Sequence, residues 1–231
     1  MKFFSKIRSL LFSIYFNFNY LPLKQAIKLP IFLHKPIFGA LKGTVVIDGF
    51  VHFRMIELGK NNVPLYPDSG IFFQNVGGKI VFKGKCEIGN ASAIAVGKNG
   101  YLEFGNRFCA TAQLKIACQH RISFDESVLC GWETMIVDSD FHRIAEPQTA
   151  GLPYGAVVIG SKCWLSMKTI VLKNTVLPAG SVVAANSLLN KAYLIPNCLL
   201  AGSPAKVKKE GVFWNPDNDK IAYPEQENDR L

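Results

Sequence analysis

The chain has 231 residues, of which 49% are hydrophobic and 19% are charged. This composition fits one sizeable folded domain and excludes a wholly disordered chain. The formal net charge of +9 fits nucleic acid, an anionic membrane surface or a phosphorylated ligand. Because no helix-turn-helix, zinc-finger or RNA-binding signature accompanies the charge, we expect no nucleic-acid partner.

The first twenty residues have the pattern of an amphipathic helix. One face carries the apolar set Phe3, Phe4, Ile7, Leu10, Leu11, Ile14, Tyr15 and Phe18, and the other the polar set Lys2, Ser5, Ser9, Ser13 and Asn17. The segment lacks a small-residue signal-peptide cleavage site and is too polar to span a bilayer. Two interpretations stay open: residues 1–20 lie on an anionic membrane, or they pack on the protein's own core or on a neighbouring subunit.

The next segments are less regular. Residues 23–31 are predicted as a short helix or an extended lead-in, and residues 44–47 and 50–56 are predicted as strands of irregular first coils. We therefore expect residues 1–40 to form a helical or irregular lead-in.

A six-residue repeat organises the centre of the chain. The aliphatic series is Ile159, Leu165, Val171, Leu177 and Val183, and a small residue follows each four positions later: Cys163, Thr169, Thr175, Ser181 and Ser187. A period of six is neither that of a helix nor that of a half-buried strand. It predicts a coil with three flat faces, in which the aliphatic side chains fill the interior and the small ones fit the bends.

The same register occurs earlier and is interrupted three times. It includes Phe82, Ile88 and Ile94, then Phe104, Ala110 and Ile116, then Phe124, Cys130 and Ile136. The breaks at residues 97–101 and 120–122 predict longer corners. The repeat stops at Val137 and resumes at Val157, so residues 138–156 are predicted to be a loop that leaves the coil.

These patterns predict a mainly β protein, a left-handed parallel β-helix over residues 41–190. Residues 191–231 are predicted as a linker and an irregular or short helical tail. The six cysteines form no C-x-x-C pair and no cluster with zinc spacing, so we expect reduced packing cysteines and no metal site.

The hexads, the string Asp-Ser-Asp-Phe-His at 138–142, the run at 158–164 and Ala-Gly-Ser-Pro-Ala-Lys at 201–206 resemble hexapeptide-repeat acyltransferases, in the sugar and polysaccharide O-acetyltransferase branch. The resemblance covers residues 77–209. It implies a homotrimer whose active sites lie between subunits, acetyl-coenzyme A as the acyl donor, and a saccharide acceptor. It also implies that a projecting loop delivers the catalytic histidine.

His142 stands in the predicted loop and is the expected general base. A neutral imidazole can take the proton of an acceptor hydroxyl, which then attacks the thioester carbonyl. Asp140 is expected to orient the imidazole, and Asp138 and Trp132 to contact the acceptor. His120, at a corner break, is an alternative base.

The resemblance also implies which residues bind the coenzyme. Met167 and Ala185 match positions along the pantetheine groove, and Asn190, Lys191 and Lys206 lie toward the nucleotide end. Trp164 matches an aromatic beside the acyl site, and covering a turn at a subunit interface is its other interpretation. The sequence departs from the family pattern at Asn186, where a corner tolerates asparagine in the left-handed conformation.

Three interpretations of function remain open at this point. The first is saccharide O-acetylation in the cytoplasm, in a protein that is soluble or peripheral on the inner face of the cytoplasmic membrane. The second keeps the chemistry and changes the acceptor to an antibiotic, an amino sugar or serine, or the acyl group to a longer one. The third is a β-helix scaffold without catalysis.

Overall fold

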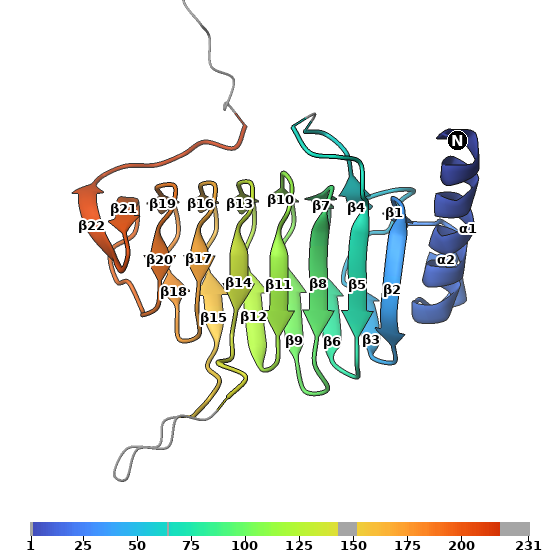
Figure 1. Cartoon of the computed structure of the whole chain (residues 1–231), viewed down its shortest axis with the longest axis horizontal. Coiled ribbons are helices and arrows are strands. Elements are labelled where there is room, and N and C mark those ends of the chain that lie inside the picture. The colour runs from blue at the N-terminus through green and yellow to red at the C-terminus, as the bar shows by residue number, and fades with distance from the viewer. Residues whose placement is uncertain (1, 64, 143–151, 218–231) are drawn as a thin grey trace, which may run out of the picture.

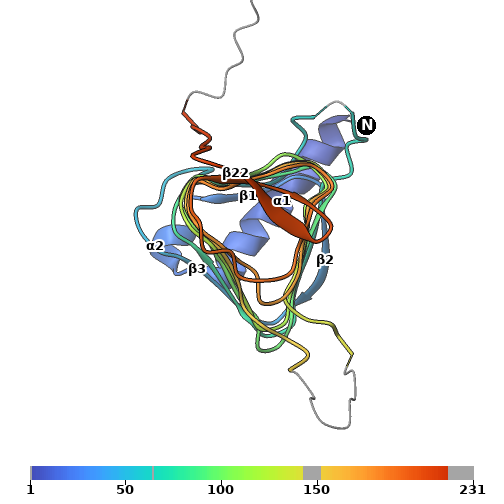
Figure 2. The same ribbon diagram turned by 90° about the vertical axis from the view of Figure 1, so that its left-hand side faces the viewer.

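Three sheets form the sides of a triangular prism (Figures 1 and 2). The structure is a computed structural model that describes residues 2–63, 65–142 and 152–217, with side chains from residue 5 onward. We call the sheets A, B and C, because the chain visits them in that order in each coil. Within the described residues every strand pair is parallel except β21 with β22.

Each sheet contains every third strand of most of the chain. Sheet A contains β1 (Ile31–Leu33), β4 (Ile56–Lys60), β7 (Cys86–Gly89), β10 (Phe108–Ala110), β13 (Leu129–Cys130), β16 (Trp164–Leu165), β19 (Val182–Val183), β21 (Cys198–Gly202) and β22 (Ala205–Glu210). Sheet B contains β2 (Pro36–Leu41), β5 (Ile71–Asn75), β8 (Ser92–Val96), β11 (Lys115–Cys118), β14 (Met135–Val137), β17 (Ile170–Val171) and β20 (Leu188–Leu189). Sheet C contains β3 (Thr44–Ile47), β6 (Lys79–Phe82), β9 (Tyr101–Phe104), β12 (Arg121–Phe124), β15 (Val157–Ile159) and β18 (Val176–Leu177).

The coil is left-handed. Figure 2 looks at the C-terminal end, with β1 at the top, β2 at the right and β3 at the left. The chain therefore turns clockwise as it advances toward the viewer, which is the left-handed sense. The predicted fold class, a left-handed parallel β-helix, is confirmed.

The hexad residues fill the interior of the prism. The five aliphatic residues from Ile159 to Val183 are each at most 1% exposed, and so are the five small ones from Cys163 to Ser187. The strand register places equivalent side chains of successive coils above one another. The rings of Phe82, Phe104 and Phe124 therefore form a ladder with successive centroids 5.2 and 5.6 Å apart. This close packing of matched side chains supplies most of the apolar burial.

The small residues also close the corners. The hydroxyls of Thr169, Thr175 and Ser181 each donate to the carbonyl oxygen three residues earlier, at 2.7 Å. A buried corner carbonyl without a partner would be costly, so this position favours a short hydroxyl side chain. Asn186 has a φ of 61°, as predicted for its corner.

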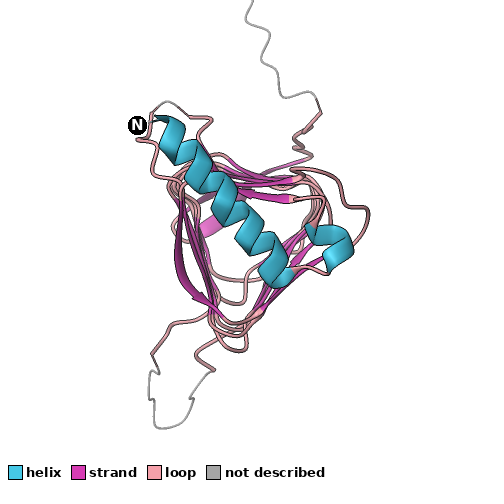
Figure 3. Ribbon diagram, turned by 90° about the vertical axis from the view of Figure 1, so that its right-hand side faces the viewer, coloured by secondary structure: helices cyan, strands magenta, loops and turns pink. Residues whose placement is uncertain are grey.

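Two helices lie at the N-terminal end of the prism (Figure 3). The helix α1 (Lys2–Tyr20) crosses the open end of the first coil, and α2 (Leu23–Ala26) is one short turn within the predicted 23–31 segment. Among the described residues, no helix combines the length and the apolar character that crossing a membrane requires.

Two predicted elements differ from the structure. The expected strand at 50–56 is irregular until Ile56, where β4 begins. The region after residue 191 contains the hairpin of β21 and β22, where the sequence predicted a linker and tail. The hexad ends before Cys198, so the pattern could not show that β21 continues sheet A and that β22 reverses on it. The predicted boundaries at residues 40 and 190 stay predictions, with strands on both sides of each.

Candidate active site

All three interruptions of the repeat lie at one edge of the prism. Residues 97–100, 119–120 and 138–156 connect strands of sheet B to strands of sheet C, and we call this edge the BC corner. The longest connection leaves between β14 and β15 and projects from the bottom of the prism in Figures 1 and 2. Its residues 143–151 lie outside the described part.

The base of the projecting loop is a short antiparallel stem. Ser139 and Tyr154 form an antiparallel bridge. The amide of Asp140 donates to the Pro153 carbonyl at 2.7 Å, and the amide of Gly155 donates to the Asp138 carbonyl at 2.9 Å. The two arms of the loop are therefore held together where they leave the coil.

Asp138 ties the stem to the preceding coil. Its side chain is fully buried, and its two carboxylate oxygens accept the amides of Gln119 at 2.7 Å and His120 at 2.8 Å. A carboxylate held by two backbone amides is a strong structural anchor. Asp138 therefore holds the stem on the preceding coil, and its acceptor contact stays a prediction.

Lys173 ties the stem to the following coil. Its ammonium group lies 2.5 Å from Oδ2 of Asp140 and donates to the carbonyl of Leu152 at 2.9 Å. The described contacts thus join Asp140 to Lys173, and none of them joins it to His142. Sequence reasoning missed Lys173, although the pairing of Met135 with Ile170 puts it one coil beyond Asp138 in the same register.

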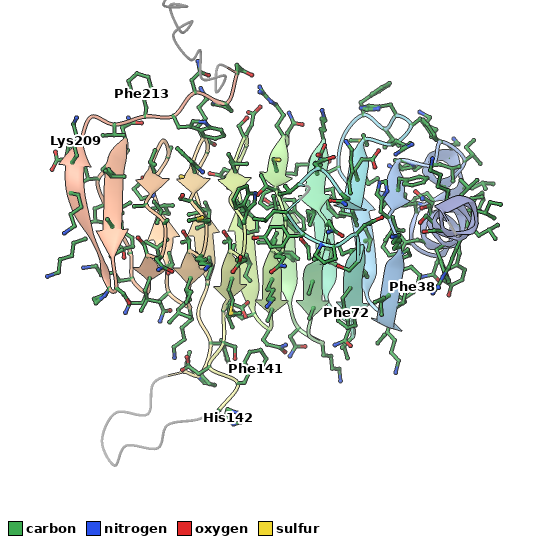
Figure 4. The ribbon with its side chains drawn as sticks, turned by 45° about the horizontal axis from the view of Figure 1, so that its top comes forward. Phe38, Phe72, Phe141, His142, Lys209 and Phe213 are labelled. Atoms are coloured by element: carbon green, nitrogen blue, oxygen red, sulfur yellow. The ribbon has the colours of Figure 1, made fainter. Side chains whose placement is uncertain are left out.

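His142 is exposed at the end of the described stem. Figure 4 shows it beside Phe141, projecting away from the body of the prism. The alternative base, His120, is also exposed, and its ring lies 4.9 Å from that of Tyr154 across the foot of the loop. The BC corner therefore presents two imidazoles at solvent, one on the coil and one on the loop.

Three of the predicted substrate and coenzyme residues form a column on a different edge. Because Met135 pairs with Ile170 and Ile170 with Leu188, Trp132, Met167 and Ala185 occupy equivalent positions in successive coils. This edge joins sheets A and B, and we call it the AB corner. Met167 is 45% exposed, Ala185 is exposed, and the half-buried Trp132 lies with its ring 6.3 Å from that of Tyr66.

The remaining predicted residues lie in three further places. Trp164 is on the outer face of sheet A, with its ring 6.3 Å from that of Trp214. Asn190 and Lys191 are exposed at the BC corner, and Lys206 is exposed in β22 at the C-terminal end. In one chain, therefore, the column of the AB corner and Trp164 do not meet His142.

The cysteines show no sign of nucleophilic chemistry. Burial raises the pKa of the Cys130 thiol well above its ordinary value and that of Cys163 to about 12. Thiols of this kind stay protonated and pack as small apolar groups. Within the described ranges, no three or more His, Cys, Asp and Glu side chains gather as a metal site would require.

Two bacterial proteins are similar to the chain in sequence. A Klebsiella pneumoniae protein described as "Uncharacterized 24.8 kDa protein in cps region" is 26% identical over 93 residues, which are 40% of this chain and 41% of that protein. An Escherichia coli (strain K12) protein described as "Putative lipopolysaccharide biosynthesis O-acetyl transferase WbbJ" is 27% identical over 164 residues, 61% of this chain and 82% of that protein. The chain thus spans about two fifths of the first relative and most of the second.

No protein-family model matches the chain. Among solved structures, the polySia specific acetyltransferase NeuO aligns with a TM-score of 0.47 and 14% identity over 82% of this chain and 92% of that one. The polysialic acid O-acetyltransferase OatWY aligns with a TM-score of 0.45 and 21% identity over 83% and 90%. The resemblance expected from the sequence is confirmed by the Escherichia coli relative.

Proposed function

We propose that the protein transfers an acetyl group from acetyl-coenzyme A to a hydroxyl of a saccharide, with His142 as the general base. The observation that carries this proposal is the projecting loop of the BC corner. The loop carries an exposed imidazole. The buried contacts of Asp138, together with the stem, hold the foot of the loop on the prism. The sequence likeness to a described O-acetyl transferase supports the same chemistry.

The proposed reaction is a direct transfer. A neutral imidazole nitrogen of His142 takes the proton of the acceptor hydroxyl, whose oxygen attacks the thioester carbonyl carbon. The tetrahedral intermediate collapses, the carbon–sulfur bond breaks, and the imidazolium returns its proton to the departing thiolate. Holding both substrates in one groove supplies a large part of the rate.

We propose that a second copy of the chain completes the site. The column of Trp132, Met167 and Ala185 lies at the AB corner, and His142 lies at the BC corner. The outer faces of sheets B and C also expose apolar side chains, including Met135 at 38%, Ile170 at 41% and Val176 at 40%. A homotrimer with sites between subunits would cover such faces and bring the two corners together.

Lys191, at the BC corner one coil beyond Lys173, suits the phosphates of the donor. Lys191 is exposed, and its ammonium group lies 5.7 Å from the ring of Tyr193. We propose the cytoplasm as the compartment, because the buried Cys86, Cys118, Cys130, Cys163 and Cys198 form no disulfide.

The test is a titration of the full chain with acetyl-coenzyme A, followed by an acceptor screen with radiolabelled donor. We expect saturable donor binding, and label transfer to a saccharide in preference to antibiotics, amino sugars and serine. Transfer to one of those other acceptors would support the second interpretation of function, in which the acceptor is not a saccharide hydroxyl. Absence of both donor binding and thioester turnover would support a scaffold and overturn the proposal. Sedimentation equilibrium of the same sample tests the trimer.

A further inference from the structure

The helix α1 docks on the prism through a face that combines polar side chains with the buried ring of Phe16. The Asn17 side chain donates to the carbonyl of Ile31 at 2.7 Å and accepts the amide of the same residue at 3.2 Å. The hydroxyl of Ser13 accepts the amide of Leu33 at 2.9 Å, and that of Ser9 accepts the amide of Lys35 at 3.0 Å. These bonds occupy backbone groups of the edge strand β1 and of Lys35 just after it, which would otherwise lack partners.

This docking turns the apolar side of α1 outward. Its residues are between 36% and 61% exposed: Ile7, Leu10, Leu11, Ile14, Tyr15 and Phe18. Leu23 and Ile27, on and just after α2, add to them at 67% and 63%. A surface helix normally buries such a stripe, so this end of the molecule needs a covering partner. We call these eight residues the end face.

The charges around the end face are of one sign. Residues 1–47 contain seven Lys and Arg and no Asp or Glu. Lys6, Arg8, Lys24 and Lys28 are all exposed beside the apolar residues. Two acids that reach this end, Glu57 and Asp68, are paired with Arg54 and Lys35, and Asp48 is exposed at the end of β3.

A largely apolar groove lies beside the end face. It has a volume of about 760 Å³ between α1 and the first coils. Its lining includes Leu10, Phe32, Phe53 and Lys6, together with Lys35 and Arg54, which pair with Asp68 and Glu57. An apolar wall beside the exposed Lys6 fits an amphiphile that carries an anionic head group.

We propose that the end face binds the surface of an anionic lipid bilayer, with α1 lying in the membrane plane. Exposed leucines and aromatic rings would enter the boundary between head groups and acyl chains, and the flanking lysines and arginine would contact lipid phosphates. A second copy of the chain fits the face less well. A symmetric contact would bring two sets of cations together, and α1 and α2 contain no acid to offset them.

This orientation determines how far the candidate active site stands from the bilayer, a point that rests on the proposed function. The strands β2, β5, β8, β11 and β14 are consecutive neighbours in sheet B. Four steps of about 4.8 Å put the His142 loop about 20 Å beyond the first coil. A saccharide attached to a membrane lipid would therefore be acetylated on its outer sugar units.

The test is flotation of the full-length protein with vesicles. The wild type should float with vesicles of phosphatidylglycerol and phosphatidylcholine and remain behind with phosphatidylcholine alone. The triple variant Leu11→Ser, Tyr15→Ser, Phe18→Ser should lower partitioning on the order of 100-fold, because three half-exposed apolar side chains lose their lipid contact. The triple variant Lys6→Gln, Arg8→Gln, Lys24→Gln should lower it by a similar factor, and added salt should do the same to the wild type.

The matched control changes apolar residues elsewhere. Leu194, Ile195 and Phe213 are 88%, 40% and 75% exposed after the last hexad. The triple variant Leu194→Ser, Ile195→Ser, Phe213→Ser should float like the wild type. Circular dichroism checks that each variant is folded, and flotation needs no turnover, so its outcome is independent of the proposed function. Equal flotation of the wild type and the end-face variants would overturn the proposal. So would a wild type that self-associates through α1 and ignores the vesicles.

Discussion

The short connections of the AB corner and the long connection at 138–156 of the BC corner differ in how they are held. Each AB connection from β13 onward is four residues long, at 131–134, 166–169 and 184–187. In the first two a hydroxyl closes the connection locally: Thr134 donates to the carbonyl of Gly131 at 2.9 Å, as Thr169 does to that of Ser166 at 2.7 Å. The BC connection at 138–156 depends instead on Asp138 and Lys173, whose partners lie in other coils.

This difference explains why the short connections repeat in sequence and the long connection does not. A short corner that satisfies its own backbone can be copied from coil to coil, and its sequence repeats. A long excursion needs contacts from its neighbours above and below, and these have no period. The corner that breaks the repeat therefore needs unique side chains, and it is also the one that can carry chemistry outward.

Asp138→Ala should have the largest effect on stability. It leaves the buried amides of Gln119 and His120 without their acceptor, at a cost of about 3 kcal/mol in the free energy of unfolding. The same change should loosen the stem and lower acetyl transfer. Urea denaturation measures the stability change. A loss as small as that of an AB corner hydroxyl would contradict the special role of Asp138 in the connection at 138–156.

Lys173→Met should separate positioning from stability. Because the pair with Asp140 is partly exposed, its loss should cost less than about 1 kcal/mol of unfolding free energy. We expect kcat to fall about tenfold, with KM for acetyl-coenzyme A unchanged, since the two arms of the loop lose their common contact. Lys98→Met, at an exposed lysine of an earlier BC connection, is the control and should keep full kcat. Equal kcat in the two variants would show that Lys173 does not position the loop.

Thr169→Val should have the smallest effect on stability, and it measures how much one hydroxyl of the AB corner contributes. The change keeps the shape of the side chain and removes its bond to the Ser166 carbonyl. Thermal or urea unfolding should show a loss of about 1 kcal/mol. A loss of 3 kcal/mol or more would mean that this AB connection is held as strongly as the connection at 138–156.

Much of the fold could be predicted because it follows from one period. Ile159 to Val183 specified the interior, and the interruption between Val137 and Val157 located the loop. The hairpin of β21 and β22 could not be predicted, because the hexad ends before Cys198. Packing of residues 1–20 on the protein's own core was one of two interpretations left open, and the hydrophobic pattern could not show that Ser9, Ser13 and Asn17 make the contacts.

The candidate site was predictable in position more than in contacts. The sequence pointed to His142 because it stands in the one long break, and the structure describes it as exposed there. It could not show that Asp138 is buried or that Asp140 pairs with Lys173, because both depend on the register between coils. Aligning Met135 with Ile170 beforehand would have brought Lys173 next to the loop.

The role of the loop imidazole as general base is tested by comparing kcat of His142→Ala and His120→Ala. Loss of a general base lowers the rate by about 10²- to 10⁴-fold, which we expect for His142→Ala with acetyl-coenzyme A binding retained. His120→Ala removes a ring that packs on Tyr154, and its kcat should fall by less than about tenfold. Near-normal kcat for His142→Ala, or a larger loss for His120→Ala, would exclude His142 as the general base.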